Sequence, residues 1–139
     1  MRQFRTRRRV EFVDTDMGGI VHFSRFLVFM ETAEHLFHDA LGFSVAEQLA
    51  GPRIAWPRVK VACEYRSPAR FGDVLDIELT VLRKGRSSIT YGFRFDADGR
   101  ELATGEVTAV CCELAPGRPP RSIPIPEALA AKIDEAPRG

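Results

Sequence analysis

Two carboxylates and a pair of glycines lie close together near the start of the chain: Asp14, Asp16, Gly18 and Gly19. Acidic residues followed by glycines favour a loop, and the next residues predict a helix. The amino end of a helix presents free N–H groups and a positive dipole, which stabilise a developing oxyanion. A carboxylate beside such an end can attack a carbonyl carbon or activate a water molecule. The same residues are also typical of ordinary turn and cap chemistry.

A second polar group lies on the predicted helix and consists of Glu31, Glu34, His35 and His38. Glu31 and His35 are one helical turn apart, as are Glu34 and His38, so a metal site is conceivable. A catalytic zinc ion needs three protein ligands of matched geometry, and no second cluster in the sequence completes such a set. We therefore expect no metal and interpret these residues as the polar face of the helix.

The elements that must position these residues follow from hydrophobic periodicity. The helix is predicted over residues 24–41, with Ser24 suited to begin it and Gly42 to end it. Alternating residues predict strands over residues 5–13, 59–65, 75–81, 89–95 and 101–114, and Asp98-Gly99 is a strong hairpin signal. Strands joined by hairpins predict an antiparallel sheet and an α+β fold. One helix cannot cover both faces of that sheet, so the other face meets water or a second subunit.

Size and composition narrow the class of protein. The chain has 139 residues, which is typical of one domain, and its net charge of +1 argues against a protein that coats nucleic acid. No apolar run reaches the ~20 residues that span a bilayer. The arginines at the start, such as Arg5 and Arg7, lack the apolar stretch of a secretory signal and favour the charged edge of a strand. We expect a single domain over residues 1–139, in which residues 116–139 form a Pro-rich extension with a short helix.

The three cysteines, Cys63, Cys111 and Cys112, are an odd number, and two of them are adjacent. Adjacent cysteines rarely pair with each other, so a reducing compartment, the cytoplasm, is expected. All three are interpreted as small buried hydrophobic residues.

Two stretches carry a resemblance to a known family. Residues 14–21 read Asp-Thr-Asp-x-x-Gly-Ile-Val and precede Phe26 and Glu31 in the helix, and residues 67–75 read Ser-Pro-Ala-Arg-Phe-Gly-Asp-Val-Leu. The first run resembles the motif of the 4-hydroxybenzoyl-CoA thioesterase-like family of hotdog-fold acyl-CoA thioesterases, and the second is similar to the start of that family's second long strand. The resemblance implies a hotdog fold, in which an antiparallel sheet wraps around one long helix. It also implies homodimers or homotetramers whose sheets join edge to edge, with sites between subunits.

The resemblance further implies an acyl-CoA thioesterase without a cofactor, because CoA is part of the substrate. The family's catalytic carboxylate falls on Asp16, as nucleophile or general base, and its carbonyl-polarising backbone N–H falls on Phe23. A thiol with a pKa of ~8.5 leaves readily as its thiolate. One carboxylate and one backbone N–H donor therefore suffice for hydrolysis of the thioester, without a metal ion or a catalytic triad. Asp14 is expected to shape the loop by accepting local backbone N–H groups. Some members carry tyrosine at the place of Phe12 and histidine at that of Phe23, whereas here the histidine is one position earlier, at His22.

Substrate contacts are expected in two further places: at Gly19, Val21 and His22 around the loop, and at Arg83, Lys84 and Arg86, which would bind the phosphates of CoA. A solvated hairpin tip is the alternative for the basic turn, and a structural turn residue is the alternative for His22. Four aromatic residues are candidates for the acyl pocket or for plain core, namely Phe26, Phe29, Trp56 and Tyr65. Glu31 is the reserve catalyst, because a related branch of hotdog thioesterases uses a helix glutamate.

Other functions are weighed against this expectation. The sequence Val21-His22-Phe23 is similar to the start of a hydroxyacyl dehydratase motif, but Ser24 stands where that motif has proline. A non-catalytic acyl-thioester-binding module remains possible, although Asp16 beside the glycines argues against it. The near-neutral charge argues against an RNA-binding arm at the amino end. The acyl group, and the choice between CoA and acyl-carrier-protein substrates, stay open.

Overall fold

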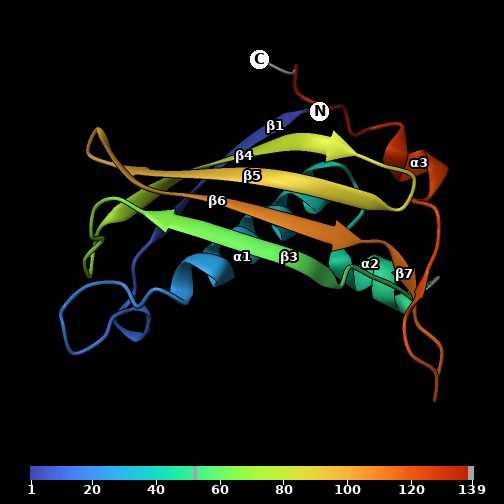
Figure 1. Ribbon diagram of the computed structural model, residues 1–139, viewed down its shortest axis with the longest axis horizontal. Helices are drawn as coiled ribbons and strands as arrows, with labels where there is room; N and C mark the ends of the chain where they lie inside the picture. Colours follow the sequence, from blue (N-terminus) through green and yellow to red (C-terminus); the bar gives the residue numbers. More distant parts are fainter. Residues whose placement is uncertain (52, 138–139) are drawn as a thin grey trace.

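A five-stranded antiparallel sheet curves around one long helix, α1 (Arg25–Ala40), and a small sheet of short strands lies at one end (Figure 1). This computed structural model describes residues 1–51 and 53–137. The α+β class and the sheet wrapped around a helix are therefore as the sequence predicts. Within the described residues, none of the helices has the length and apolar composition to cross a membrane.

The large sheet holds β1 (Gln3–Arg9), β3 (Arg58–Tyr65), β4 (Val74–Lys84), β5 (Ser88–Ala97) and β6 (Arg100–Val110). The small sheet holds β2 (Ile54–Ala55), β7 (Cys112–Glu113) and β8 (Arg121–Ser122), and two short helices are α2 (Val45–Ala50) and α3 (Glu127–Ala130). The strand expected over residues 5–13 ends earlier in the structure, at Arg9, because a 3-10 turn, Phe12–Asp14, follows it. The expected last strand divides near Cys111, and α2, β2 and β8 were not predicted.

The strand order β1-β4-β5-β6-β3 corrects the expectation that every strand pairs with the next by a hairpin. β3 and β4 are consecutive in sequence but lie on opposite sides of the β5–β6 hairpin. The connection between them returns to the end of β1, where Val10 N–H donates to Asp73 O at 2.8 Å and Gly72 N–H donates to Val10 O at 3.0 Å. β4 consequently pairs with β1, and β3 is left as the opposite edge of the sheet.

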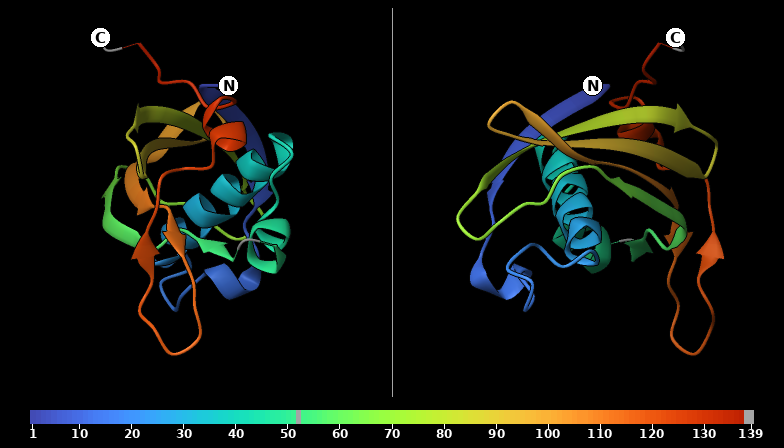
Figure 2. Two further views of the ribbon diagram at one scale, coloured as in Figure 1. Left: turned by 90° about the vertical axis from the view of Figure 1, so that its right-hand side faces the viewer. Right: turned by 60° about the vertical axis from the view of Figure 1, so that its left-hand side comes forward.

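α1 packs its apolar stripe into the concave face of the sheet (Figure 2). The stripe consists of Phe26, Phe29, Met30, Ala33 and Phe37, none more than 3% exposed. Gly105 of β6 permits the close approach, because a Cβ there would lie 2.0 Å from Met30 Cε. The helix ends as expected, with Gly42 at a positive φ of 82° after it.

The two turns predicted from the sequence within the sheet are confirmed. Asp98 and Gly99 both have positive φ, 49° and 73°, which matches the right-handed twist of a tight hairpin. The basic turn is also in its expected place between β4 and β5, although Arg83 and Lys84 are the last residues of β4 and the connection itself is residues 85–87. The carboxyl-terminal extension then packs back on the domain, with Ile125, Leu129 and Ile133 buried, and α3 lies near the amino terminus (Figure 2). The last two residues of the predicted extension, 138–139, lie outside the described residues.

The cysteines are free thiols; Cys111 and Cys112 are buried and Cys63 is half-buried. Two of the three therefore behave as the buried hydrophobic residues that the sequence predicts. The charged edge is also confirmed, since β1 is an edge strand whose Arg5 and Arg7 pair with Glu78 and Asp76 of β4 at 2.8 Å.

Candidate active site

Asp16 lies in a narrow loop that folds back on itself before α1. Thr15 and Val21 form a β-bridge, and Asp16 N–H donates to Ile20 O at 3.0 Å. The turn between them needs glycine at position 19, where φ is +78°. Asp16 Oδ1 accepts from Gly18 N–H at 2.8 Å, whereas none of the hydrogen bonds among the described residues uses Oδ2. Asp16 is exposed, so its carboxylate is available to a substrate.

Asp14, two residues earlier, has the opposite environment and is fully buried. Its Oδ2 accepts from Glu11 N–H at 2.8 Å, which confirms the predicted contact with a local backbone N–H. Its Oδ1 accepts from Arg25 Nε and Nη2 at 2.8 and 2.7 Å, and Arg8 Nη2 lies 3.7 Å away. Asp14 thus ties the loop to the first residue of α1 and to β1, and its two arginine partners were not predicted from the sequence.

Phe23 occupies the last turn of chain before α1. Its carbonyl accepts from the Tyr65 hydroxyl at 2.8 Å, which fixes this turn to the end of β3. Within the described residues its N–H has no hydrogen-bond partner, and its side chain is 66% exposed. The expected oxyanion donor is therefore a free N–H at the amino end of the helix, in the position that a helix dipole makes favourable for an anion.

His22 faces Ser24 instead of Asp16. His22 Nδ1 lies 2.7 Å from Ser24 Oγ and accepts from Ser24 N–H at 3.2 Å. Because Nδ1 is an acceptor, the proton of the neutral ring is on Nε2. Ser24 is the N-cap residue of α1, as expected, but its hydroxyl is engaged by this imidazole and makes no cap hydrogen bond.

The remaining residues expected around the loop divide between core and surface. Val21 is 5% exposed and donates its N–H to Ala69 O at 2.8 Å, so it anchors the loop to the second family-like stretch and its side chain belongs to the core. Phe26 and Phe29 are also core residues. Tyr65 is 49% exposed and packs edge-on against Phe26, with ring centroids 5.4 Å apart, so it lies at the surface beside the loop.

Glu34 and His38 are not on a polar face, which corrects the interpretation of the helix. They are 2% and 1% exposed, because α1 turns them toward α2 and the start of β3. Arg58 Nη2 donates to Glu34 Oε2 in a very short contact. Burial raises the pKa of Glu34 to about 7, against the opposing charge of Arg58. Burial also lowers the pKa of His38 to about 4, and nearby His35 acts in the same direction.

A chain of hydrogen bonds holds His38 in one neutral form. Trp56 Nε1 donates to Gln48 Oε1 at 2.8 Å and Gln48 Nε2 donates to Phe43 O at 2.8 Å, which fixes the orientation of the Gln48 amide. Gln48 Nε2 then donates to His38 Nδ1 at 2.9 Å, so the ring carries its proton on Nε2, 3.1 Å from Tyr91 Oη. The sequence did not reveal Gln48, Tyr91 or Arg58 as members of this cluster.

The cluster is held by its own internal bonds. Of the described residues, no group of three or more His, Cys, Asp or Glu side chains is arranged to hold a metal ion. Glu31, the reserve catalyst, is exposed on α1 near Glu34 and contributes to the raised pKa of that carboxyl.

The basic turn lies at the opposite end of the sheet from Asp16. β4 begins beside Arg9, next to the loop, and runs 11 residues to Lys84, a distance of about 36 Å at ~3.3 Å per residue. Lys84 Nζ donates to Ala130 O and Ile133 O at 2.9 and 2.8 Å, so it secures the end of α3 and differs in this from Arg83 and Arg86. Arg83 and Arg86 are exposed.

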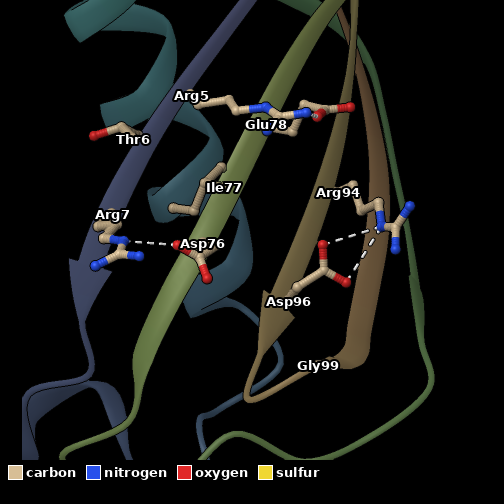
Figure 3. A pocket seen from close by; sticks show the side chains of 9 residues that line it. All are labelled: Arg5, Thr6, Arg7, Asp76, Ile77, Glu78, Arg94, Asp96 and Gly99. Carbon is tan, nitrogen blue, oxygen red and sulfur yellow. Dashed lines mark hydrogen bonds and ion pairs between the residues drawn. The ribbon is translucent and has the colours of Figure 1, made fainter.

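A hollow of about 720 Å³ lies on the outer face of the sheet (Figure 3). None of the residues expected at the active site or at the basic turn lines it. Its side chains form ion pairs across neighbouring positions, Arg7 with Asp76 at 2.8 Å and Arg94 with Asp96 at 3.0 Å. The charges of this hollow are therefore matched to one another, and the Asp16 loop remains the candidate active site.

Comparison with known proteins finds relatives along most of the chain. The profile of the thioesterase-like superfamily matches residues 10–133. The acyl-CoA thioester hydrolase YbgC of Escherichia coli O6:H1 is 32% identical over 126 residues, which cover 86% of this chain and 92% of that protein. A 1,4-dihydroxy-2-naphthoyl-CoA hydrolase of Synechococcus elongatus is 27% identical over 130 residues, which cover 93% of each.

Solved structures share the fold over nearly the whole chain. A gentisyl-coenzyme A thioesterase superposes with a TM-score of 0.83 and 28% identity, over 93% of this chain and 98% of that one. A 4-hydroxybenzoyl-CoA thioesterase variant bound to 4-hydroxybenzoyl-CoA superposes with a TM-score of 0.86 and 19% identity, over 95% and 99%. At that lower identity the likeness establishes the hotdog fold.

Proposed function

We propose, because this chain belongs to the thioesterase-like superfamily, that it hydrolyses an acyl- or aroyl-CoA thioester with Asp16 as its catalytic carboxylate. The chain is a thioester hydrolase, in keeping with the names of its relatives. One observation carries the assignment to Asp16. In the same loop Asp14 is buried and bonded through both oxygens, while Asp16 is exposed with Oδ2 free of the described hydrogen bonds.

The reaction needs one base and one oxyanion donor. As a general base, Asp16 takes a proton from water while the water oxygen bonds to the thioester carbonyl carbon. The Phe23 N–H donates to the oxyanion that forms. When this intermediate collapses, the C–S bond breaks and the CoA thiolate leaves and takes the proton from Asp16. As a nucleophile, Asp16 would form an anhydride that water then cleaves, with the same acid and thiol as products.

A second copy of the chain joins at β3 in this proposal. β3 is an edge strand with unpaired backbone groups along one side, and Val59, Val61 and Tyr65 on it are 64%, 43% and 49% exposed. Such an edge is a template for pairing with another strand. Self-pairing around a two-fold axis is antiparallel and continues the sheet into the second copy, which supports the expected dimer.

This pairing also gives the basic turn a role in substrate binding. A two-fold axis through β3 brings the β4–β5 turn of the second copy to the end of the assembly where Asp16 lies. Arg83 and Arg86 of that copy are then the candidates for the CoA phosphates, because guanidinium groups bind phosphate oxygens in pairs. Lys84 stays with α3.

The test is a thiol-release assay over short, long and aromatic acyl-CoAs for the parent protein and three variants. Asp16→Asn is expected to lower kcat by about a hundredfold or more, because an amide is neither a carboxylate nucleophile nor a useful base. Asp14→Asn and Glu31→Gln are the matched controls. Near-normal turnover of Asp16→Asn together with loss in Glu31→Gln would move the catalyst to the helix, and no cleavage of any thioester by the parent would refute the proposal.

A further inference from the structure

The turn that carries Phe23 has one free backbone donor in a stretch that is otherwise bonded. His22 N–H donates to Asp14 O at 2.9 Å, and His22 O accepts from Arg25 N–H at 2.9 Å. Phe23 O accepts from the Tyr65 hydroxyl at 2.8 Å. Of the described residues, none accepts from the N–H of Phe23. The surrounding bonds therefore hold the backbone on both sides of the proposed oxyanion donor.

Two side chains bond both polar atoms of one peptide group, the group between Phe23 and Ser24. Its oxygen accepts from the Tyr65 hydroxyl, and its N–H donates to His22 Nδ1 at 3.2 Å. A peptide group is planar, so bonds at its oxygen and at its N–H together fix its orientation. The Phe23 N–H belongs to the preceding peptide group, from which only the φ and ψ of Phe23 separate it. Fixing one group therefore restricts the direction of the other.

Tyr65 is itself held in place. Its backbone pairs with Ala103 of β6, and its ring packs edge-on against Phe26 of α1 with ring centroids 5.4 Å apart. Partial burial raises the pKa of Tyr65 to about 12, and the nearby Cys63 acts in the same direction, so the hydroxyl stays a donor at neutral pH. Tyr65 thus ties the turn before α1 to the sheet.

The His22 ring does here what an asparagine side chain does in an Asx turn, which is to accept from the backbone N–H two residues later. The ring also packs on that of Phe23, with centroids 4.4 Å apart and planes 30° apart. The contribution of His22 to the turn is consequently an acceptor atom in a fixed position.

We propose that Tyr65 and His22 are positioning residues for thioester hydrolysis, which hold the Phe23–Ser24 peptide group so that the Phe23 N–H stays directed at the thioester oxygen. This inference rests on the proposed thioesterase function. Loss of an oxyanion donor lowers kcat by roughly a hundred- to a thousandfold, and a donor that is present but less well directed should cost less, about tenfold. The loss falls on kcat, because the bond strengthens as charge develops on the oxygen.

Kinetics of Tyr65→Phe test the first residue, on whichever of hexanoyl-, palmitoyl- and benzoyl-CoA the parent cleaves fastest. The change removes the hydroxyl and keeps the ring against Phe26, so kcat should fall about tenfold with KM and the melting temperature near those of the parent. Tyr91→Phe is the matched control, since the only other tyrosine is bonded to His38 in the buried cluster, and it should keep its kcat. Unchanged kcat in Tyr65→Phe, or a raised KM alone, would overturn the inference.

Two substitutions test His22 independently. His22→Leu removes the acceptor, and kcat should fall about tenfold. His22→Asn places an amide oxygen where it can accept from the same Ser24 N–H, and kcat should return to within about threefold of the parent. Equal losses in the two variants would overturn the positioning role, because the reaction would then need the imidazole itself.

The carbonyl stretch of the bound substrate reports the donor directly, because a hydrogen bond to the thioester oxygen lowers its frequency. Asp16→Asn is expected to bind without cleavage, so infrared spectra with a ¹³C label at the thioester carbonyl measure this shift in the bound state. The shift should be smaller in Asp16→Asn/Tyr65→Phe than in Asp16→Asn. Equal shifts in the two, including no shift in either, would contradict the inference.

The outcomes separate this inference from the proposed function. Full kcat in Tyr65→Phe and His22→Leu, together with a loss in Asp16→Asn, would overturn only the positioning role. Absence of cleavage of all three thioesters by the parent would overturn both.

Discussion

The two ends of α1 carry the same kinds of side chain in opposite environments. At the amino end Asp16 and His22 belong to an exposed loop, and Asp16 keeps one oxygen free of the described hydrogen bonds. In the carboxyl-terminal half, Glu34 and His38 are almost completely buried and bonded to Arg58 and Gln48. Carboxylate and imidazole groups acquire different roles because access to solvent and the number of fixed partners differ.

The contrast is repeated within the loop itself, on a smaller scale. Asp14 is buried against Arg25, and Asp16 is exposed two residues later. The backbone changes course between them, because Asp14 ends the 3-10 turn Phe12–Asp14 and Asp16 follows in the glycine turn closed by the Thr15–Val21 bridge. The buried carboxylate sets the shape of the loop and the exposed one is free for chemistry.

The largest effect on stability is expected from the buried aspartate. Asp14→Ala leaves Arg25 and Arg8 without their shared partner and removes the acceptor of Glu11 N–H, so the free energy of unfolding should fall by about 3 kcal/mol. Asp16→Ala loses one exposed hydrogen bond and should change it by about 0.5 kcal/mol or less. Urea unfolding of both variants measures the difference, and equal losses would erase the distinction between the two carboxylates.

The buried cluster predicts opposing pH effects on stability. Glu34, with its pKa raised to about 7, binds more protons when folded, so its contribution to stability falls as pH rises from 4.5 to 7. His38, with its pKa lowered to about 4, binds fewer protons when folded, so its contribution rises between pH 4 and 6.5. In the parent the two largely cancel between pH 4.5 and 6.5.

Single variants should reveal how each group changes the free energy of unfolding with pH. Between pH 4.5 and 6.5 the free energy of unfolding of Glu34→Gln should rise relative to the parent by about 2 kcal/mol, and that of His38→Gln should fall by a similar amount. Unfolding curves at a series of pH values measure both. If both variants follow the pH profile of the parent, the two groups do not titrate as their burial requires.

The smallest effects are expected at the basic turn. Lys84→Met removes two bonds to the end of α3 and should lower the free energy of unfolding by about 1 kcal/mol without changing KM. Arg83→Ala/Arg86→Ala should leave stability unchanged and raise KM for CoA thioesters a few-fold at low salt, an effect that salt weakens. Thermal melts measure the stability of each variant, and steady-state kinetics measure its KM. An unchanged KM in the double variant would show that the turn is only a solvated hairpin tip.

The sequence predicts the parts of the fold that depend on local patterns. The periodicity of α1 and the Asp98-Gly99 turn are local signals, and both are confirmed. The place of β3 at the sheet edge is not local, because it depends on the pairing of the 66–73 connection with the end of β1. Hydrophobic alternation does not specify which strand pairs with which.

The same limit applies to the candidate site. Asp16 could be predicted from the sequence, because a carboxylate followed closely by glycines and then by a helix is visible in the order of the residues. The burial of Glu34 could not, because it depends on Arg58 and on the unpredicted helix α2, which cover that side of α1. A helix glutamate with i+4 histidine has the same spacing whether it faces solvent or a cavity.

The most direct test of the central claim is a comparison of kcat for Asp16→Asn and Glu34→Gln on a plain acyl-CoA, with the affinity for the CoA thioester measured in parallel. We expect kcat of Asp16→Asn to fall by about a hundredfold or more while its affinity and melting temperature stay near those of the parent. Glu34→Gln should keep its kcat on this substrate. Near-normal turnover of Asp16→Asn, or loss of kcat in Glu34→Gln alone, would contradict the assignment of the chemistry to the exposed loop.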